Sequence, residues 1–178
     1  MTMFLLFALG VLSGLIAYIS LLPDTFKITR SIVVSASPER IYPEINELQN
    51  WPKWWPWARR GSAQKISFEG SPLGPGAICE WSGDDKVSAG KVKITESSQN
   101  ERIRGKLKLD RPIKAVSDIQ FDLKGTGEAQ TEIVCTMSGR NEFVGKAAHF
   151  FMNMDKLFGG QFEQGLAALK SVAEAPAE

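Results

Sequence analysis

The stretch Ile28–Trp57, which reads ITRSIVVSASPERIYPEINELQNWPKWWPW, decides the fold of this chain. Its first part is rich in β-branched residues, with apolar side chains at alternate positions, which predicts a strand over Lys27–Ser35. Ser37 then stands at an N-cap position and Pro38 at the first helical position, so we expect a helix that runs to about Ile45. The stretch therefore predicts a strand, a helix and then a loop.

The segment 64–138 shows the alternation that is typical of half-buried strands, interrupted by turns rich in Gly, Pro, Asp and Asn. Strands are expected at Ile66–Phe68, Ala77–Ser82, Val87–Glu96, Arg102–Leu109, Ala115–Leu123 and Thr131–Ser138. Gly125–Gly127 is expected to form a turn, and Gly90 is a candidate β-bulge. Consecutive strands of this kind favour an antiparallel sheet with one covered face.

After Asn141 the apolar residues recur at spacings of three and four as far as Leu169, which is typical of one long amphipathic helix. Glycines at Gly159-Gly160 and Gly165 interrupt this pattern and indicate either a kink or a close approach to the sheet. Because the strands run consecutively and the helices stand apart from them, the predicted fold class is α+β.

This order of elements, together with several local sequences, resembles the SRPBCC superfamily, also called START-like or Bet v 1-like. The similar sequences are RSIVVSASPERIYPEI, NWPKWWPW, the strand start at Gly74–Trp81, and MDKLFGGQFEQGLAALK near the C-terminus. They are similar to the bacterial polyketide cyclase/dehydrase-like branch, whose members often carry an N-terminal apolar segment. The resemblance implies a helix-grip fold, in which a curved antiparallel sheet of about seven strands surrounds a long C-terminal helix. An apolar ligand would lie between them.

Residues 1–23 carry no charged side chain, and Met3–Leu22 is almost wholly apolar. A helix of this length would rise roughly 30 Å, which matches the hydrocarbon core of a bilayer. A transmembrane anchor is the favoured interpretation; a cleaved signal peptide and a buried core helix are the alternatives. We expect an anchor at 1–23, a linker at 24–26, the helix-grip domain at 27–174 and a tail at 175–178.

The charges that flank the anchor bear on its orientation. Lys27 and Arg30 follow it and no side-chain cation precedes it, so the positive-inside rule favours a cytoplasmic domain. These two residues also belong to the first predicted strand, which leaves the side of the membrane open. The expected location is the cell membrane, with a single pass.

Composition excludes several classes of function. A net charge of +1, with no basic run and no phosphate-binding glycine loop, gives no case for a nucleic-acid partner. The one histidine, His149, lies beside the apolar stripe of the long helix, where a surface side chain is the simpler interpretation and a general base the alternative. Cys79 and Cys135 alternate with core residues, and no metal-ligand spacing exists. We expect no metal and no cofactor, while protein partners are open.

No catalytic residue is predicted. Arg102, Glu80 and Glu142 are ionisable candidates for a cyclisation reaction, but each fits a solvent-facing or helix-cap position better. The chain is therefore expected not to be an enzyme, with cyclase or dehydratase chemistry as the alternative.

Trp51, Trp54, Trp55 and Trp57 lie within seven residues, and Pro52 and Pro56 within this segment prevent long regular structure. Three interpretations are open: the rings close one end of the sheet, they contact the membrane interface, or they form a cavity mouth. Apolar residues that face the helix would line any cavity. The candidate ligand-binding residues are Trp55, Trp81, Phe121, Ile133, Met137, Phe150, Met154 and Phe158.

The favoured function is membrane-tethered binding of a small hydrophobic or amphipathic ligand, lipid or polyketide-like, between the sheet and the C-terminal helix. One alternative is a cyclase or dehydratase that acts on a hydrophobic substrate. The other is a structural or interaction module with a filled core. A structure with no interior pocket of roughly 300 Å³ or more would favour the filled core.

Overall fold

The computed structural model describes residues 1–58, 65–83, 89–111, 114–127, 129–140, 145–146 and 154–176. Its helices are α1 (Thr2–Leu21), α2 (Pro38–Asn46), the short 3-10 helices η1 (Leu48–Lys53) and η2 (Pro56–Ala58), and α4 (Met154–Glu174). Its strands are β1 (Thr25–Val34), β2 (Lys65–Gly70), β3 (Ala77–Ser82), β4 (Ala89–Ser98), β5 (Arg102–Arg111), β6 (Ala115–Gly127) and β7 (Gln130–Arg140). This order confirms the predicted α+β class.

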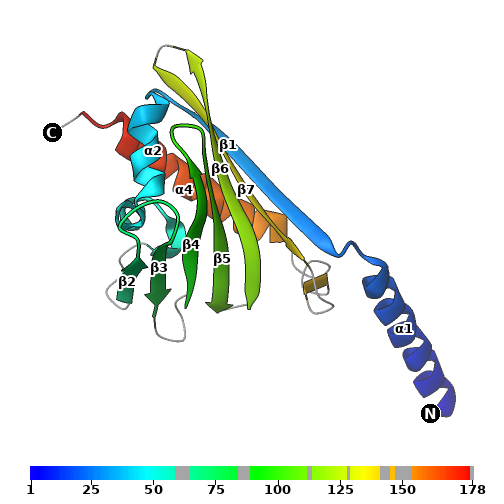
Figure 1. Ribbon diagram of the computed structural model, residues 1–178. Coiled ribbons are helices and arrows are strands. Elements are labelled where there is room, and N and C mark those ends of the chain that lie inside the picture. Colours follow the sequence, from blue (N-terminus) through cyan, green and yellow to red (C-terminus); the bar gives the residue numbers. More distant parts are fainter. Residues whose placement is uncertain are drawn as a thin grey trace.

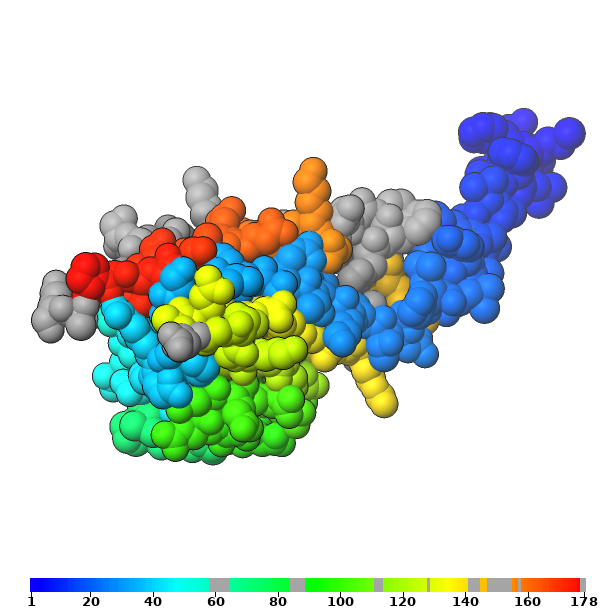
Figure 2. Space-filling view, turned by 90° about the horizontal axis from the view of Figure 1, so that it is seen from above, coloured from blue at the N-terminus to red at the C-terminus, as the bar shows by residue number. Residues whose placement is uncertain are grey.

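The strands form one seven-stranded antiparallel sheet in the order β1-β7-β6-β5-β4-β3-β2. The first strand closes against the last, with Ile28 opposite Met137 and Ile32 opposite Ile133. Helix α4 lies along one face of the sheet, as the ribbon shows (Figure 1) and as the view from above repeats (Figure 2). The predicted helix-grip fold is confirmed.

Helix α4 contacts the rest of the domain through two of the glycines that interrupt its apolar stripe. A Cβ added at Gly159 would lie 2.0 Å from Arg30 Nη2 of β1, and one added at Gly165 would lie 2.9 Å from Pro56 Cδ of η2. Gly159 therefore serves the predicted close approach to the sheet, whereas Gly165 serves a close approach to η2. The stripe between residues 141 and 153 lies mostly outside the described residues.

The predicted turn at Gly125–Gly127 is wrong, because β6 continues to Gly127. Gly125 still pairs with Thr131 of β7, and Gly127 pairs with Gln130 after an irregularity in register. The backbone pairing between β6 and β7 thus continues for several residues beyond the end of the apolar alternation in the sequence. The predicted irregularity near Gly90 is present, since the register of β4 against β5 shifts between Ala89 and Gly90.

Helix α1 projects away from the domain into open space (Figures 1 and 2). It is long and apolar enough to cross a membrane, and its side chains are exposed, apart from the partly buried Leu15 and the buried Ile19. At the junction, Lys146 Nζ donates a hydrogen bond to the carbonyl oxygen of Ser20 at 2.9 Å and lies 2.5 Å from Asp24 Oδ1. Lys146 thus connects the end of the apolar helix to a segment far away in sequence.

Candidate ligand-binding site

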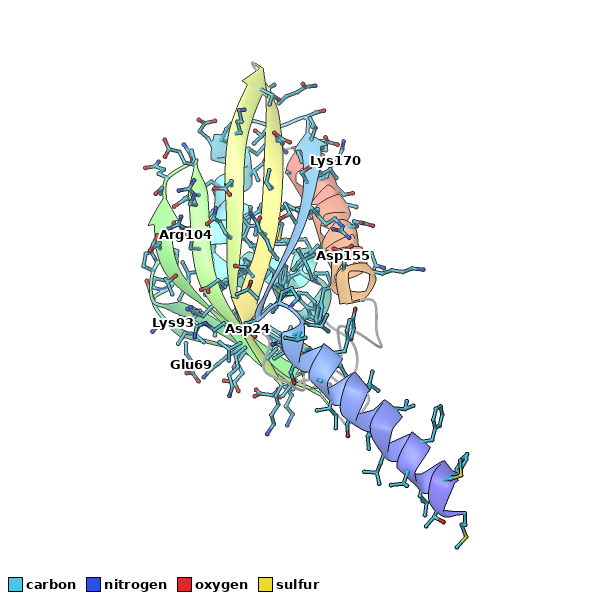
Figure 3. All side chains as sticks on the ribbon, turned by 90° about the vertical axis from the view of Figure 1, so that its right-hand side faces the viewer. Asp24, Glu69, Lys93, Arg104, Asp155 and Lys170 are labelled. Carbon is cyan, nitrogen blue, oxygen red and sulfur yellow. The ribbon has the colours of Figure 1, made fainter. Side chains whose placement is uncertain are left out.

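The two faces of the sheet differ sharply in chemistry. The face toward α4 is apolar and buried, whereas the outer face carries ion pairs such as Arg102–Asp122 and Lys106–Asp118. Lys93 and Arg104 stand on this outer face, opposite the side from which Asp155 and Lys170 of α4 project (Figure 3). The paired side chains on the outer face are largely exposed, so this face is a solvated surface. Its ion pairs therefore contribute little to stability. The inner face is the candidate site.

The tryptophan loop lies against the inner face as one aromatic cluster. Trp55 is its centre: the centroid of its ring lies 4.5 Å from that of Trp51, 5.5 Å from Trp54, 6.0 Å from Phe121 of β6 and 6.1 Å from Phe162 of α4. These tilted and edge-on contacts are the preferred geometries of aromatic pairs. Each fully buried ring contributes on the order of 1.5–3 kcal/mol of burial free energy. The loop therefore closes the space between sheet and helix.

Hydrogen bonding separates the buried tryptophans into two pairs. Trp51 Nε1 donates to the carbonyl oxygen of Ile45 at 2.8 Å, and Trp54 Nε1 donates to that of Glu44 at 2.9 Å, so α2 fixes both rings. Trp55 Nε1 and Trp81 Nε1 are buried without an acceptor in the described part of the chain. Leaving a buried donor without an acceptor costs about 1–3 kcal/mol.

The eight predicted ligand-binding residues fall into three groups. Trp55 and Phe121 are in ring contact, and Phe158 approaches the same cluster through Trp57, with centroids 6.2 Å apart. Trp81, Ile133 and Met137 are buried on the inner face of β3 and β7 and belong to the same core. Phe150 lies outside the described residues, as does the side chain of Met154. The structure brings six of them to one face, and ligand contact remains a prediction for all.

A groove of about 310 Å³ opens at the edge of the sheet. It lies between η1 and the edge strands, and Phe68 on its wall is half exposed. The groove is lined by Leu48, Gln49, Phe68, Glu69, Gly70, Ser71, Pro72, Ala77 and Ile78. Gly70, Gly74 and Gly76 all adopt positive φ, a backbone conformation that favours glycine. These three glycines are the sequence feature from which the bends of the chain beside the groove could have been predicted. None of the predicted ligand-binding residues lines this groove.

A polar cluster joins α2 to β4. Ser97 Oγ donates to Asn46 Oδ1 at 2.6 Å and is also hydrogen-bonded to the hydroxyl of Tyr42. The backbone carbonyl of Asn46 accepts a hydrogen bond from the amide of Gly74 at 3.0 Å. Asn46 is buried, and this hydrogen bond holds the loop that contains Gly74 against α2. The sequence offered no signal for this contact, because the partners are far apart along the chain.

The candidate reactive side chains in the described part of the chain either lie buried in the core or stand exposed on the surface. Burial raises the pKa of the Cys79 thiol to about 12 and raises that of Cys135 as well, so both thiols stay protonated and are poor nucleophiles. Arg102 pairs with Asp122 on the outer face, and Glu80 is exposed there. Glu142 and His149 lie outside the described residues, and the described ones hold no cluster of metal-binding side chains.

Residues 25–174 match the family model described as polyketide cyclase / dehydrase and lipid transport. The chain belongs to this family. The match covers the sheet, the tryptophan loop and α4, and it agrees with the resemblance seen in the sequence. A comparison with curated proteins finds no match.

Solved structures share the fold of this polyketide cyclase / dehydrase and lipid transport family member. The Zhui aromatase/cyclase from Streptomyces sp. R1128 is similar with a TM-score of 0.65 and 10% identity, over 84% of this chain and 94% of that one. A protein from Chromobacterium violaceum gives 0.58 and 18% identity, over 87% and 100%. The Aha1 dimer from Colwellia psychrerythraea gives 0.56 and 21%, over 84% and 96%. At these identities the likeness concerns the fold alone.

Proposed function

We propose that this chain is a membrane-tethered protein that binds a small hydrophobic or amphipathic ligand between the inner face of the sheet and α4. The main support is the contrast between a largely apolar inner face, which ends at the tryptophan cluster, and an outer face that carries ion pairs. Binding sites for small molecules are mostly apolar, with a few polar groups that orient the ligand. The family description, which includes lipid transport, also supports the binding of a hydrophobic ligand.

The proposed tether is α1, with residues 1–23 as anchor, 24–26 as linker, 27–174 as binding domain and 175–178 as tail. Exposed cations support this arrangement, because several of them lie at the end of the sheet that is continuous with α1. Register places the start of β1 beside the end of β7, and the start of β6 beside the end of β5. The exposed basic residues at this end are Lys27, Lys65, Lys91, Lys108, Lys114 and Arg140. Basic segments next to a membrane helix are attracted to anionic headgroups.

The experiment is ligand detection on the full-length chain in detergent. Native mass spectrometry after release from the micelle should reveal a bound small molecule, and the neutral hydrophobic dye Nile red should give a saturable rise in fluorescence. Met137→Phe, on the inner face of β7, should weaken this binding by about tenfold through lost space. Val134→Phe, on the outer face of the same strand, is the matched control and should bind like the wild type. A chain with no co-purified molecule and no saturable response would overturn the proposal.

A further inference from the structure

Trp55 and Trp81 carry hydrogen-bond donors that the described part of the chain leaves unused. Both side chains are about 1% exposed, so bulk water does not reach their indole nitrogens. Trp51 and Trp54, which are equally buried, donate to backbone carbonyls of α2. Two buried tryptophans of this core thus have a hydrogen-bond acceptor within the described part of the chain, and the other two do not.

A buried donor without a partner requires an explanation, because buried polar groups in proteins are almost always hydrogen-bonded. The indole nitrogen can only donate, so the missing partner must supply an acceptor atom. The packing of neither ring requires this donor, since the apolar contacts of an indole come from its carbon atoms. The two donors therefore indicate an acceptor that comes from outside the described chain.

Both donors belong to the face that is proposed to hold the ligand. Trp55 lies between Phe121 of the sheet and Phe162 of α4. Trp81 projects from β3 to the same side, and its ring lies against the backbone of β4, where a Cβ on Gly90 would be 3.0 Å from Trp81 Cζ2. The loop thus supplies one unused donor to this core and the sheet supplies the other.

The charge of the acceptor follows from the surroundings. Lys146 is the one buried cation among the described residues, and it is already bonded to Ser20 and Asp24 at the α1 junction. Arg30 is paired with Asp155 and Glu163 at the helix surface. A carboxylate buried on the inner face would lack a compensating charge, which is costly. A neutral oxygen is the better match.

We infer that the ligand carries a neutral carbonyl oxygen, as in a ketone or an ester, and that Trp55 and Trp81 select it by donating hydrogen bonds. This inference rests on the proposed function and names the chemistry of its ligand. The two indoles are specificity-determining residues. A pure hydrocarbon of the same shape would leave both donors unpaired and bind more weakly.

Two probes of nearly equal shape test this inference on the full-length chain in detergent. 2-Acetylnaphthalene has a ketone oxygen where 2-ethylnaphthalene has hydrogen atoms. The ketone should bind about five- to tenfold more tightly, which is the effect of one or two hydrogen bonds. Trp55→Phe and Trp81→Phe should reduce this preference, whereas Trp51→Phe and Trp54→Phe should keep it, since their donors are already used.

A measurement on the wild type avoids any loss of folding in the variants. In the ¹⁵N-labelled protein, the indole signals of Trp55 and Trp81 should differ between the two complexes, because both probes have the same ring currents and only one accepts a hydrogen bond. Saturable binding of both probes with equal affinity and equal indole signals would overturn the inference and leave hydrophobic binding intact. If neither probe bound saturably, the inference would fail, and the proposed function would fail with it only if native mass spectrometry and the dye titration were also negative.

Discussion

Arg30 of β1 packs directly over Gly159 of α4, where a Cβ would meet its guanidinium at 2.0 Å. From this position the guanidinium binds Asp155 at 2.9 Å and Glu163 at 2.7 Å, on either side of the glycine. Arg30 stands on the inner side of β1, opposite Cys135, among apolar neighbours. The absence of a side chain at Gly159 is therefore what lets a charged strand residue reach two carboxylates of the helix.

Gly159→Ala and Gly160→Ala form a matched pair of substitutions. Alanine at Gly160 meets nothing within 4 Å and should stabilise the helix by roughly 0.5–1 kcal/mol. Alanine at Gly159 must displace the end of the Arg30 side chain and should gain clearly less stability, or lose some. In an Arg30→Ala background both alanines should give the same gain. Chemical unfolding followed by circular dichroism measures each value, and equal effects of the two alanines in the wild type would contradict the role given to Gly159.

The Arg30–Asp155 contact also predicts a dependence of stability on pH. The hydrogen bond from Arg30 lowers the pKa of Asp155 below its ordinary value of 3.8. A carboxyl group with a lowered folded-state pKa contributes stability above its unfolded pKa, and this contribution is lost as pH falls through the folded pKa. The wild type should therefore lose more stability than Asp155→Asn between about pH 5 and pH 3.

The size of this effect should be small, because the Asp155 side chain is largely exposed and the pair is screened by solvent. Unfolding free energies at several pH values measure it. The control is Arg30→Gln, in whose background Asp155→Asn should no longer change the pH dependence. A difference that persists in that background would assign the effect to another partner.

Gly165→Ala should destabilise the protein where Gly160→Ala does not. Its Cβ would lie 2.9 Å from Pro56 Cδ and 3.1 Å from Cγ, and a proline ring cannot rotate away. Crowding of this kind costs about 1–3 kcal/mol, against a gain in helix propensity of about 1 kcal/mol. A net loss on the order of 1 kcal/mol is expected, with a change in tryptophan fluorescence because the loop that carries Trp55 must shift. Unchanged fluorescence and stability would show that α4 does not press on this loop.

The sequence predicts most of the fold because its signals are local. Apolar alternation locates the strands, and the Ser37-Pro38 pair locates the start of α2, both of which the structure confirms within a few residues. Arg30 interrupts the apolar face of β1. Its partners could not be predicted, because 125 and 133 residues separate it from Asp155 and Glu163.

The site is less predictable than the fold for the same physical reason. The apolar pattern indicates which tryptophans and strand residues are buried. It does not indicate that Trp51 and Trp54 find carbonyls of α2 while Trp55 and Trp81 do not, because this depends on how the loop folds back. The turn predicted at Gly125–Gly127 failed because backbone pairing with β7 continues beyond the apolar pattern.

The proposed tether predicts that the α1 end of the sheet contacts an anionic bilayer. Lys27 and Lys114 are exposed at this end, whereas Lys124 is exposed near the opposite end of β6. Each cation near an anionic surface contributes about 1 kcal/mol of attraction. In nanodiscs that contain anionic lipid, backbone amides beside Lys27 and Lys114 should exchange more slowly with solvent than in zwitterionic nanodiscs. The double variant Lys27→Glu/Lys114→Glu should abolish this protection, and Lys124→Glu should preserve it. Equal exchange in the two kinds of nanodisc would mean that α1 holds the domain away from the headgroups, so the basic residues at this end would then have no role in membrane contact.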